Sequence, residues 1–253
     1  MFMKNQKIYL NKAKEDWIID RATKEWNSFS NNTSRYVFNS DVVWLIAPWL
    51  WKKVNKKYLK NKKVVCSIYH IDEDKFNDTY KKDFYERDKF VDAYHVISKI
   101  TENQVRKLTD KQIFSIPFWL NQDIYFEIKE NNHLLKKYGL ENKKYLIGSF
   151  QRDTEGEDLI SPKLSKGPDR FVELVQKIQN KREGVHVVLA GHRRQFVIEE
   201  LKKRNINYSY FEMVNFTELN ELYNCLDLYI VASRFEGGPQ SILECANTKT
   251  PIV

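Results

Sequence analysis

The chain has 253 residues, which at about 100 to 200 residues per domain predicts one large domain or two small ones. Hydrophobic residues make up 42% and aromatic residues 14% of it, which excludes the aromatic-poor composition of disordered chains. No run approaches about 18 apolar residues, and the first residues contain no apolar signal segment. We therefore expect a folded protein of the cytoplasm with no membrane-spanning helix.

Charge and composition divide the chain. Of the net charge of +8, most lies in residues 1–130, which hold 24 basic and 18 acidic residues. All six tryptophans lie at or before Trp119, whereas all eight glycines lie at or after Gly139. These shifts predict two domains, residues 1–130 and residues 131–253. The cysteines are odd in number and scattered through apolar stretches, so we expect buried thiols rather than disulfides or a zinc site.

Short apolar segments alternate with Lys-rich stretches in the first half. Because each is continuous and rich in β-branched and aromatic residues, we expect strands buried on both faces of a parallel sheet. Thr101 and Gln104 form a capping-box pattern, which predicts a helix to about Leu108. Residues 121–140 suit a connection between domains. The predicted strands are Lys7–Leu10, Asp41–Ala47, Val64–Tyr69, Ala93–Ile97 and Gln112–Ile116.

The second half alternates strands and helices more regularly. Such alternation predicts a parallel sheet with right-handed crossovers, and such sheets bind ligands on the loops that follow the carboxyl ends of their strands. The predicted strands are Tyr145–Phe150, Val185–Ala190, Tyr208–Phe211, Leu226–Ala232 and a last one that begins at Pro251. The predicted helices are Pro168–Lys181, Phe196–Arg204, Glu218–Asn224 and Pro239–Thr248.

One of these loops has the composition of a ligand site. Gly237 and Gly238 allow a ligand to approach the backbone closely, and the helix that follows offers free N–H groups and a positive dipole end to an anion. Glu236 and Glu244 flank the turn with carboxylates, which would repel phosphate but accept hydrogen bonds from the hydroxyls of a sugar or ribose. The alternative is a plain Gly-Gly turn before an ordinary amphipathic helix.

These residues carry a resemblance to a known family. Glu236 and Glu244 have seven residues between them and are followed by Cys245-Ala246 and Thr250-Pro251-Ile252-Val253. This pattern resembles the signature of the retaining glycosyltransferases of family 4, the glycosyl transferases group 1. Ile147-Gly148-Ser149-Phe150 and Lys166-Gly167 fall in the family's order. The resemblance covers residues 145–253 and rests on strand order elsewhere. It implies an α/β fold of two Rossmann-like domains whose parallel sheets face a cleft, named GT-B, with the C-terminal end lacking.

The resemblance also assigns donor-binding roles. It implies that Glu236 contacts hydroxyls of the donor sugar and that Glu244 contacts the ribose of the nucleotide. The donor is a nucleotide diphosphate sugar, and no cofactor or metal is implied. The remaining residues that the resemblance assigns to donor binding are Gly148, Gly237, Gly238 and Pro239.

Two cations are implied for the diphosphate. The family uses an Arg and a Lys after the first strand of its second domain, and Arg152 and Lys166 stand there, separated by the acidic insert 153–164. Paired cations stabilise a leaving group as its charge develops. His70, which follows a predicted strand, matches a histidine that reaches the donor sugar from the first domain. The resemblance thus implies metal-independent transfer with retention, although Asp72-Glu73-Asp74 also fits a metal-binding Asp-x-Asp pattern.

The residues leave other functions open. A sugar-nucleotide epimerase or a phosphorylase would share the phosphate-binding corner, and a non-catalytic membrane-associated protein could retain the fold. Residues 44–51 hold three tryptophans, and residues 52–63 hold seven lysines and no acid. This pattern suits an anionic membrane surface, a solvated helix or, least well, nucleic acid. The membrane interpretation fits an enzyme on the inner face of the membrane that glycosylates a lipid-linked or cell-envelope glycan.

Overall fold

The computed structural model describes residues 6–14 and 18–253, and it divides into two compact units. Unit 1 is Met1–Phe118 and unit 2 is Trp119–Val253. The division falls earlier than the predicted boundary after residue 130. The reason is that Phe126 N–H and Ile128 N–H donate to the side chains of Asn220 and Asn224, at 3.0 and 2.7 Å. The predicted interdomain connection therefore belongs to unit 2.

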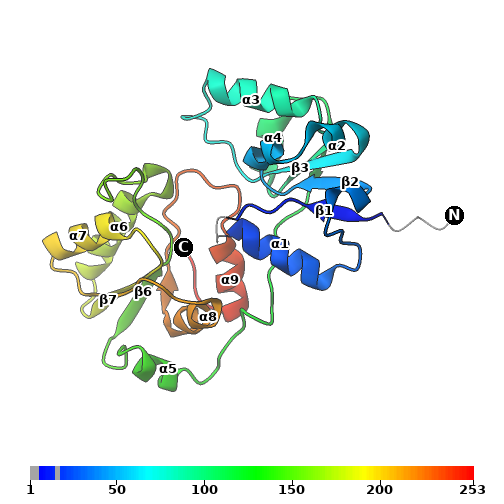
Figure 1. Cartoon of the computed structure of the whole chain (residues 1–253). Coiled ribbons are helices and arrows are strands. Elements are labelled where there is room, and N and C mark those ends of the chain that lie inside the picture. The colour runs from blue at the N-terminus through cyan, green and yellow to red at the C-terminus, as the bar shows by residue number, and fades with distance from the viewer. Residues whose placement is uncertain (1–5, 15–17) are drawn as a thin grey trace. The chain divides into compact units, whose positions relative to one another are not determined.

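Unit 1 contains one parallel sheet whose strands follow chain order, β1-β2-β3-β4-β5 (Figure 1). All four pairings are parallel, as predicted. The strands are β1 Ile8–Leu10, β2 Val42–Leu45, β3 Lys63–Ile68, β4 Ala93–Val96 and β5 Gln112–Ser115. The helices are α1 Ile18–Phe29, α2 Lys56–Asn61, α3 Asp78–Asp88 and α4 Lys99–Arg106, with 3-10 turns η1 Val37–Asn39 and η2 Pro48–Lys53.

The two faces of the unit 1 sheet differ. One face, with Leu45 and Cys66, packs against apolar residues of η2, α2, α3 and α4. The other face is polar and aromatic. There Trp44 Nε1 donates to Ser67 Oγ at 2.8 Å, and the same hydroxyl lies 2.8 Å from Nδ1 of His95. The cysteines Cys66, Cys225 and Cys245 are buried free thiols, as predicted.

Two predictions for unit 1 are wrong in detail. Helix α4 begins after Ser98, whose hydroxyl accepts the N–H of Thr101 at 3.3 Å, so Thr101 lies inside the helix and is not its cap. Strand β5 is largely exposed rather than buried, because it forms the edge of the sheet. Within the described residues, no helix is long and apolar enough to cross a membrane.

Unit 2 contains a four-stranded parallel sheet in the order β8-β7-β6-β9. The strands and helices agree closely with those that the sequence predicts, with three exceptions. Strand β9 is short, α5 was not predicted, and the predicted last strand from Pro251 forms only a single bridge between Tyr229 and Ile252. The strands are β6 Tyr145–Ser149, β7 Val185–Ala190, β8 Tyr208–Phe211 and β9 Leu228–Tyr229. The helices are α5 Asn132–Lys137, α6 Pro168–Gln179, α7 Gln195–Lys203, α8 Phe216–Cys225 and α9 Gln240–Thr248, with the 3-10 turn η3 Leu164–Lys166.

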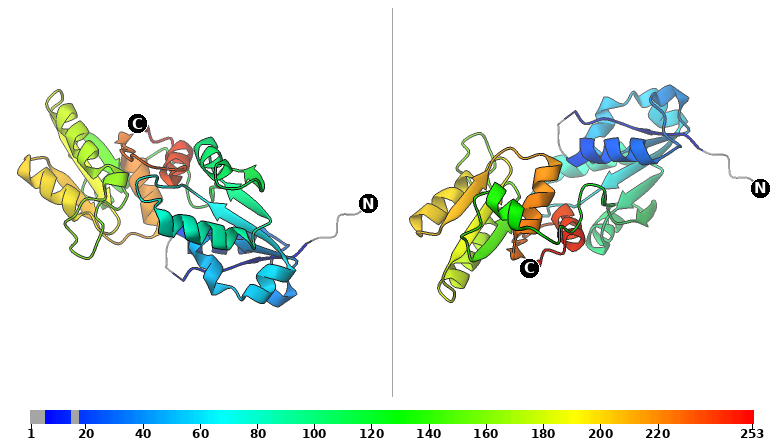
Figure 2. Two further views of the ribbon diagram at one scale, coloured as in Figure 1. Left: turned by 90° about the horizontal axis from the view of Figure 1, so that it is seen from above. Right: turned by 90° about the horizontal axis from the view of Figure 1, so that it is seen from below.

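Helices cover both faces of this sheet. Phe171 of α6 and Leu201 of α7 share an apolar cluster with Val187 of β7. Leu222 of α8 and Cys245 of α9 share another cluster with Val188, the next residue of the same strand. Since successive residues of a strand point to opposite faces, α6 and α7 lie on one face and α8 and α9 on the other. The views of Figures 1 and 2 show the same three layers.

Candidate functional site

The strand order of unit 2 reverses between β6 and β9. The chain proceeds from β6 to β7 and β8 on one side, then returns to place β9 on the other side of β6. Ligands of open α/β sheets bind at such a topological switch point, outside the carboxyl ends of the two strands. The loops that leave these ends here are residues 150–167 and residues 230–239. Among the predicted donor-binding residues, these loops contain Arg152, Lys166, Glu236, Gly237, Gly238 and Pro239.

A glycine joins the two loops. Gly167 has the left-handed conformation, with φ 63° and ψ 41°. A Cβ atom at this position would lie 1.9 Å from the carbonyl oxygen of Ala232, a distance that no side chain can occupy. Next to this contact, the N–H of Arg234 donates to the carbonyl of Ser165 at 2.8 Å. The close approach of the two loops therefore depends on the absence of a side chain at residue 167.

A bidentate ion pair strengthens the same junction. Arg234 Nη1 and Nη2 donate to Oδ1 and Oδ2 of Asp169 at 2.7 and 2.5 Å, and Nη1 also donates to the carbonyl of Leu164 at 2.9 Å. These hydrogen bonds lower the pKa of the Asp169 carboxyl and raise the pKa of Arg234. Paired N–H···O bonds of this kind fix orientation as well as distance. Neither residue was singled out from the sequence, although Arg234 lies inside the motif.

Lys166 and Glu236 form an ion pair where the loops meet. Their side chains are 25% and 18% exposed. Ser233 Oγ lies 3.0 Å from Oε1 of Glu236 and 3.2 Å from Oε1 of Gln151, whose Nε2 donates to the carbonyl of Lys166 at 2.8 Å. The structure thus brings together two residues that the sequence predicts and adds Gln151 and Ser233 as their hydrogen-bonding neighbours.

Helix α9 begins beside this pair. Pro239 is its N-terminal flanking residue and has no side-chain oxygen with which to cap the first turn. Gly237 is buried and Gly238 is exposed. The first N–H groups of an α-helix have no partner within the helix, and together with the helix dipole they favour an anion. Binding of a phosphate at this helix start stays a prediction.

Glu244 lies deeper than the sequence suggests. It is 5% exposed, and Oε2 accepts a hydrogen bond from the hydroxyl of Tyr223 at 2.8 Å. Burial raises the pKa of Tyr223 well above its ordinary value, with the charge of Glu244 as a further cause. Tyr223 therefore stays protonated and orients the carboxylate from α8. The predicted contact of Glu244 with ribose stays a prediction.

Gly148 has a packing role. A Cβ atom on this buried residue of β6 would lie 2.1 Å from Cδ1 of Leu226. A side chain at this position would force Leu226 to shift, so Gly148 has a packing reason that is independent of any ligand. Contact between Gly148 and a donor stays a prediction.

The other two predicted catalytic residues, Arg152 and His70, are not part of the ion pair of Lys166. Arg152 Nε donates to the carbonyl of Thr154 at 2.7 Å, which holds the guanidinium against the insert. Burial and the neighbouring charge of Arg193 lower the pKa of Arg152. His70 is exposed and follows β3 in unit 1. The roles of Arg152 and His70 stay predictions.

A buried ion pair that the sequence did not indicate supports the first loop. Arg194 is fully buried, and its Nε lies 3.1 Å from Oδ2 of Asp153. Its other nitrogens donate to the carbonyl of Gln151 and, at 3.2 Å, to the hydroxyl of Ser149. Burial raises the pKa of Asp153 to about 6, although Arg194 opposes the rise. Arg194 thereby holds the end of β6 and the start of the loop that carries Gln151.

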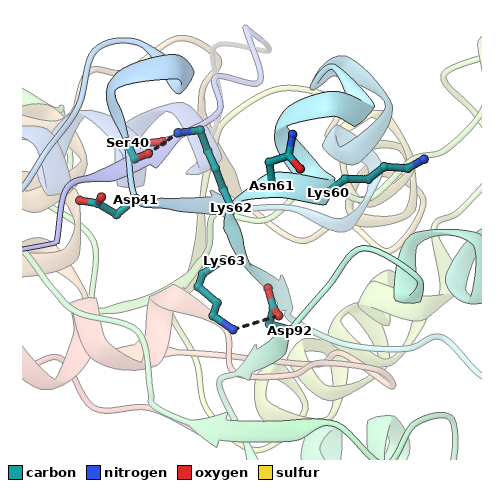
Figure 3. A pocket seen from close by; sticks show the side chains of 7 residues that line it. All are labelled: Ser40, Asp41, Lys60, Asn61, Lys62, Lys63 and Asp92. Atoms are coloured by element: carbon teal, nitrogen blue, oxygen red, sulfur yellow. Dashed lines mark hydrogen bonds and ion pairs between the residues drawn. The ribbon is translucent and has the colours of Figure 1, made fainter.

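A hollow of about 480 Å³ lies in unit 1, lined by residues at the amino ends of the strands rather than at their carboxyl ends (Figure 3). Asp41 and Asp92 directly precede β2 and β4, so the hollow lies at the amino ends of the strands, where parallel sheets do not bind ligands. Two of its lysines already have partners, since Lys62 donates to the carbonyl of Ser40 and Lys63 lies 3.6 Å from Asp92. We therefore place the candidate site in unit 2.

Comparisons with known proteins show what the chain is similar to. Residues 160–253 match the family model of glycosyl transferases group 1. HepE from Anabaena, solved in complex with UDP, is similar over 98% of this chain and 79% of its own, with a TM-score of 0.68 and 12% identity. The fold is GT-B.

Further structures share this GT-B fold. WaaG, a glycosyltransferase involved in lipopolysaccharide biosynthesis, is similar over 97% of this chain and 80% of its own, with a TM-score of 0.66 and 11% identity. TarM has a TM-score of 0.61 and 15% identity, and the match covers 92% of this chain but 43% of TarM. The chain thus spans less than half the length of TarM. No curated protein matches it.

We expect Gly167→Ala to destabilise unit 2 more than Gly139→Ala. Both glycines have φ near 65°, so each alanine carries the left-handed penalty of about 1 to 2 kcal/mol. Only residue 167 would also push a Cβ atom into a backbone carbonyl, whereas nothing lies within 4 Å of a Cβ atom at residue 139. Urea denaturation measures both free energies of unfolding. Equal losses would contradict the close loop contact.

Proposed function

We propose that the chain transfers a sugar from a nucleotide diphosphate sugar to an acceptor, with retention of configuration and without a metal ion. The observation that carries the proposal is the pairing of Lys166 with Glu236 at the switch point of unit 2. Both residues belong to the segment that matches the glycosyl transferases group 1 model. A cation and a sugar-binding carboxylate at one corner are what a nucleotide diphosphate sugar requires.

The diphosphate binds at Lys166 and the start of α9 in this proposal. The lysine supplies a full positive charge, and the amides after Gly238 supply partial charges in a fixed direction. Complexes of HepE with UDP and with UDP-glucose support a nucleotide diphosphate as the ligand of this fold. Arg152 is the second cation, which reaches the diphosphate after leaving the carbonyl of Thr154.

The two glutamates divide the rest of the donor. Glu236, at the mouth of the site, accepts hydrogen bonds from hydroxyls of the sugar. Glu244, oriented by Tyr223, accepts hydrogen bonds from the ribose. Charged acceptors suit hydroxyl donors because such hydrogen bonds are about twice as strong as neutral ones.

The reaction breaks the bond between the anomeric carbon and the diphosphate oxygen and forms one to the acceptor oxygen on the same face. The departing diphosphate takes the proton of the acceptor hydroxyl, so no side chain needs to act as a general base. Lys166 stabilises the negative charge that develops on the leaving group, and the resemblance to the family assigns His70 to the donor sugar. The positioning of the reactants and the preorganised charge then lower the activation barrier of the transfer.

The acceptor in this proposal is a lipid-linked or cell-envelope glycan, reached at an anionic membrane surface from the cytoplasm. The side chains of residues 44–63, which we propose for membrane binding, differ in their exposure. Trp51 is buried, and Trp44 donates to Ser67, whereas Trp49 is 48% exposed. Lys52 pairs with Asp83 at 2.6 Å. The exposed lysines of α2, which are Lys56, Lys57 and Lys60, remain as the attractive charges.

We expect Lys166→Ala to weaken binding of UDP by about tenfold to a hundredfold, because a hydrogen bond to a charged group contributes roughly 1.5 to 3 kcal/mol. Binding of uridine should change little, since it has no phosphate. Isothermal titration calorimetry measures both. Lys177→Ala, which removes an exposed lysine from α6, is the matched control and should bind UDP like the wild type.

Equal losses for UDP and uridine would contradict the assigned role of Lys166. If no nucleoside diphosphate in a panel of bases binds the wild type, the proposed function fails. Sugar transfer from a labelled nucleotide sugar then separates an enzyme from a non-catalytic binding protein of the same fold.

We expect the chain to co-sediment with phosphatidylglycerol-containing vesicles at low salt and to dissociate as salt rises, because exposed charges are screened over about 8 Å at physiological ionic strength. Reversing Lys56, Lys57 and Lys60 to Glu should abolish binding. The same three-charge reversal at the exposed Lys136, Lys177 and Lys181 of unit 2 should have little effect. If both triple variants lose vesicle binding equally, the attraction depends only on net charge, and the proposed binding surface on α2 is contradicted.

A further inference from the structure

We propose that the ion pair between Lys166 and Glu236 makes the site prefer a nucleotide sugar over the nucleoside diphosphate that remains after transfer. This inference rests on the proposed function and concerns how that same site selects its ligand. In the proposed function Lys166 binds the diphosphate of the donor and Glu236 binds its sugar. A ligand that offers only one of those parts leaves the other half of the pair without a partner.

The pair competes with an incoming diphosphate. Without ligand, the ammonium of Lys166 is neutralised by the carboxylate of Glu236, and the two side chains are only 25% and 18% exposed. Water therefore screens their charges less than at an open surface. A diphosphate that approaches Lys166 must displace this carboxylate and then faces its negative charge at short range. Binding of a bare nucleoside diphosphate is opposed by both effects.

A nucleotide sugar removes this opposition. Its sugar hydroxyls are hydrogen-bond donors, and a carboxylate is an acceptor only. Glu236 can therefore exchange the ammonium of Lys166 for hydroxyls while Lys166 binds the diphosphate. Once the sugar has left with the acceptor, those hydroxyls are gone, and Glu236 competes for Lys166 again. The pair thus favours donor binding before transfer and release of the nucleoside diphosphate after it.

The neighbouring hydrogen bonds fit such an exchange. Ser233 has a single hydroxyl proton, yet its oxygen lies 3.0 Å from Glu236 and 3.2 Å from Gln151. The proton can serve one of these acceptors at a time. When Lys166 turns to the diphosphate, Ser233 can donate to Glu236 and keep that carboxylate oriented.

The backbone around Lys166 stays fixed during the exchange. Gln151 Nε2 holds the carbonyl of Lys166 at 2.8 Å, and the next residue, Gly167, is locked against Ala232. Arg194 in turn holds the carbonyl of Gln151 from the interior. Movement is thereby confined to the two charged side chains, which is what a rapid exchange of partners requires. Ser233 and Gln151 are positioning residues in this account.

The test compares Glu236→Gln with the wild type by calorimetry, using UDP, inorganic pyrophosphate and UDP-glucose as probes. Glutamine keeps the size of the side chain but releases Lys166 and removes the repulsion. We expect UDP and pyrophosphate to bind the variant about tenfold more tightly, because charge-assisted pairing with Lys166 is no longer contested. UDP-glucose should gain no affinity, so the preference for it over UDP falls by about the same factor.

Two further variants make the result specific. Glu199→Gln breaks an ion pair of the same kind with Lys202, 2.8 Å apart on the surface of α7, and should leave all three affinities unchanged. Ser233→Ala should lower the affinity for UDP-glucose and not that for pyrophosphate, since its hydroxyl orients Glu236 toward the sugar. A purely structural role for Ser233 would change both affinities together.

The outcomes separate the inference from the function on which it rests. If UDP and pyrophosphate bind the wild type but bind Glu236→Gln no more tightly, the inference is overturned and the proposed function stands. If Glu236→Gln tightens UDP-glucose as much as UDP, the pair does not discriminate and the inference is likewise overturned. If neither pyrophosphate nor any nucleoside diphosphate in the panel of bases binds the wild type or the variant, the proposed function fails and this inference fails with it.

Discussion

The close approach of Gly167 to the carbonyl of Ala232 is the constraint on which the candidate site depends. It joins two loops that lie far apart in the sequence, and it does so only because a glycine with φ 63° presents no Cβ atom. Once the backbones touch, the bidentate pair of Arg234 with Asp169 fixes their orientation. This junction brings Lys166 of one loop next to Glu236 of the other, so that a cation and a carboxylate form an ion pair there.

The interior of unit 2 supports this corner from two sides. Arg194 binds the end of β6 and the start of the first loop from within the protein, where removing its charge from water is costly unless partners are in place. On the other face of the sheet, Tyr223 of α8 orients Glu244 of α9. Buried polar groups thus hold two parts of the candidate site in place: Arg194 holds the loop that contains Gln151, and Tyr223 holds the carboxylate of Glu244.

Much of unit 2 could be predicted from its sequence because its signals are local. Strand β7 has both predicted ends, since all of its residues are buried. The pair of Lys166 and Glu236 could not be predicted from spacing, because it depends on a backbone contact across the fold. Arg194 also escaped prediction, since an arginine beside a loop is expected to be solvated. In unit 1, α3 has few buried residues and hence no apolar stripe to reveal it.

Hydrogen–deuterium exchange of the whole chain, with and without the tightest-binding nucleotide sugar of a panel, tests most directly that the donor binds at the switch point of unit 2. Ligand should slow exchange in residues 164–167 and in the first turn of α9, while the hollow of unit 1 around Lys62 remains unchanged. Slowed exchange around that hollow, with none in the two loops of unit 2, would contradict the placement of the site and the roles assigned to Lys166 and Glu236.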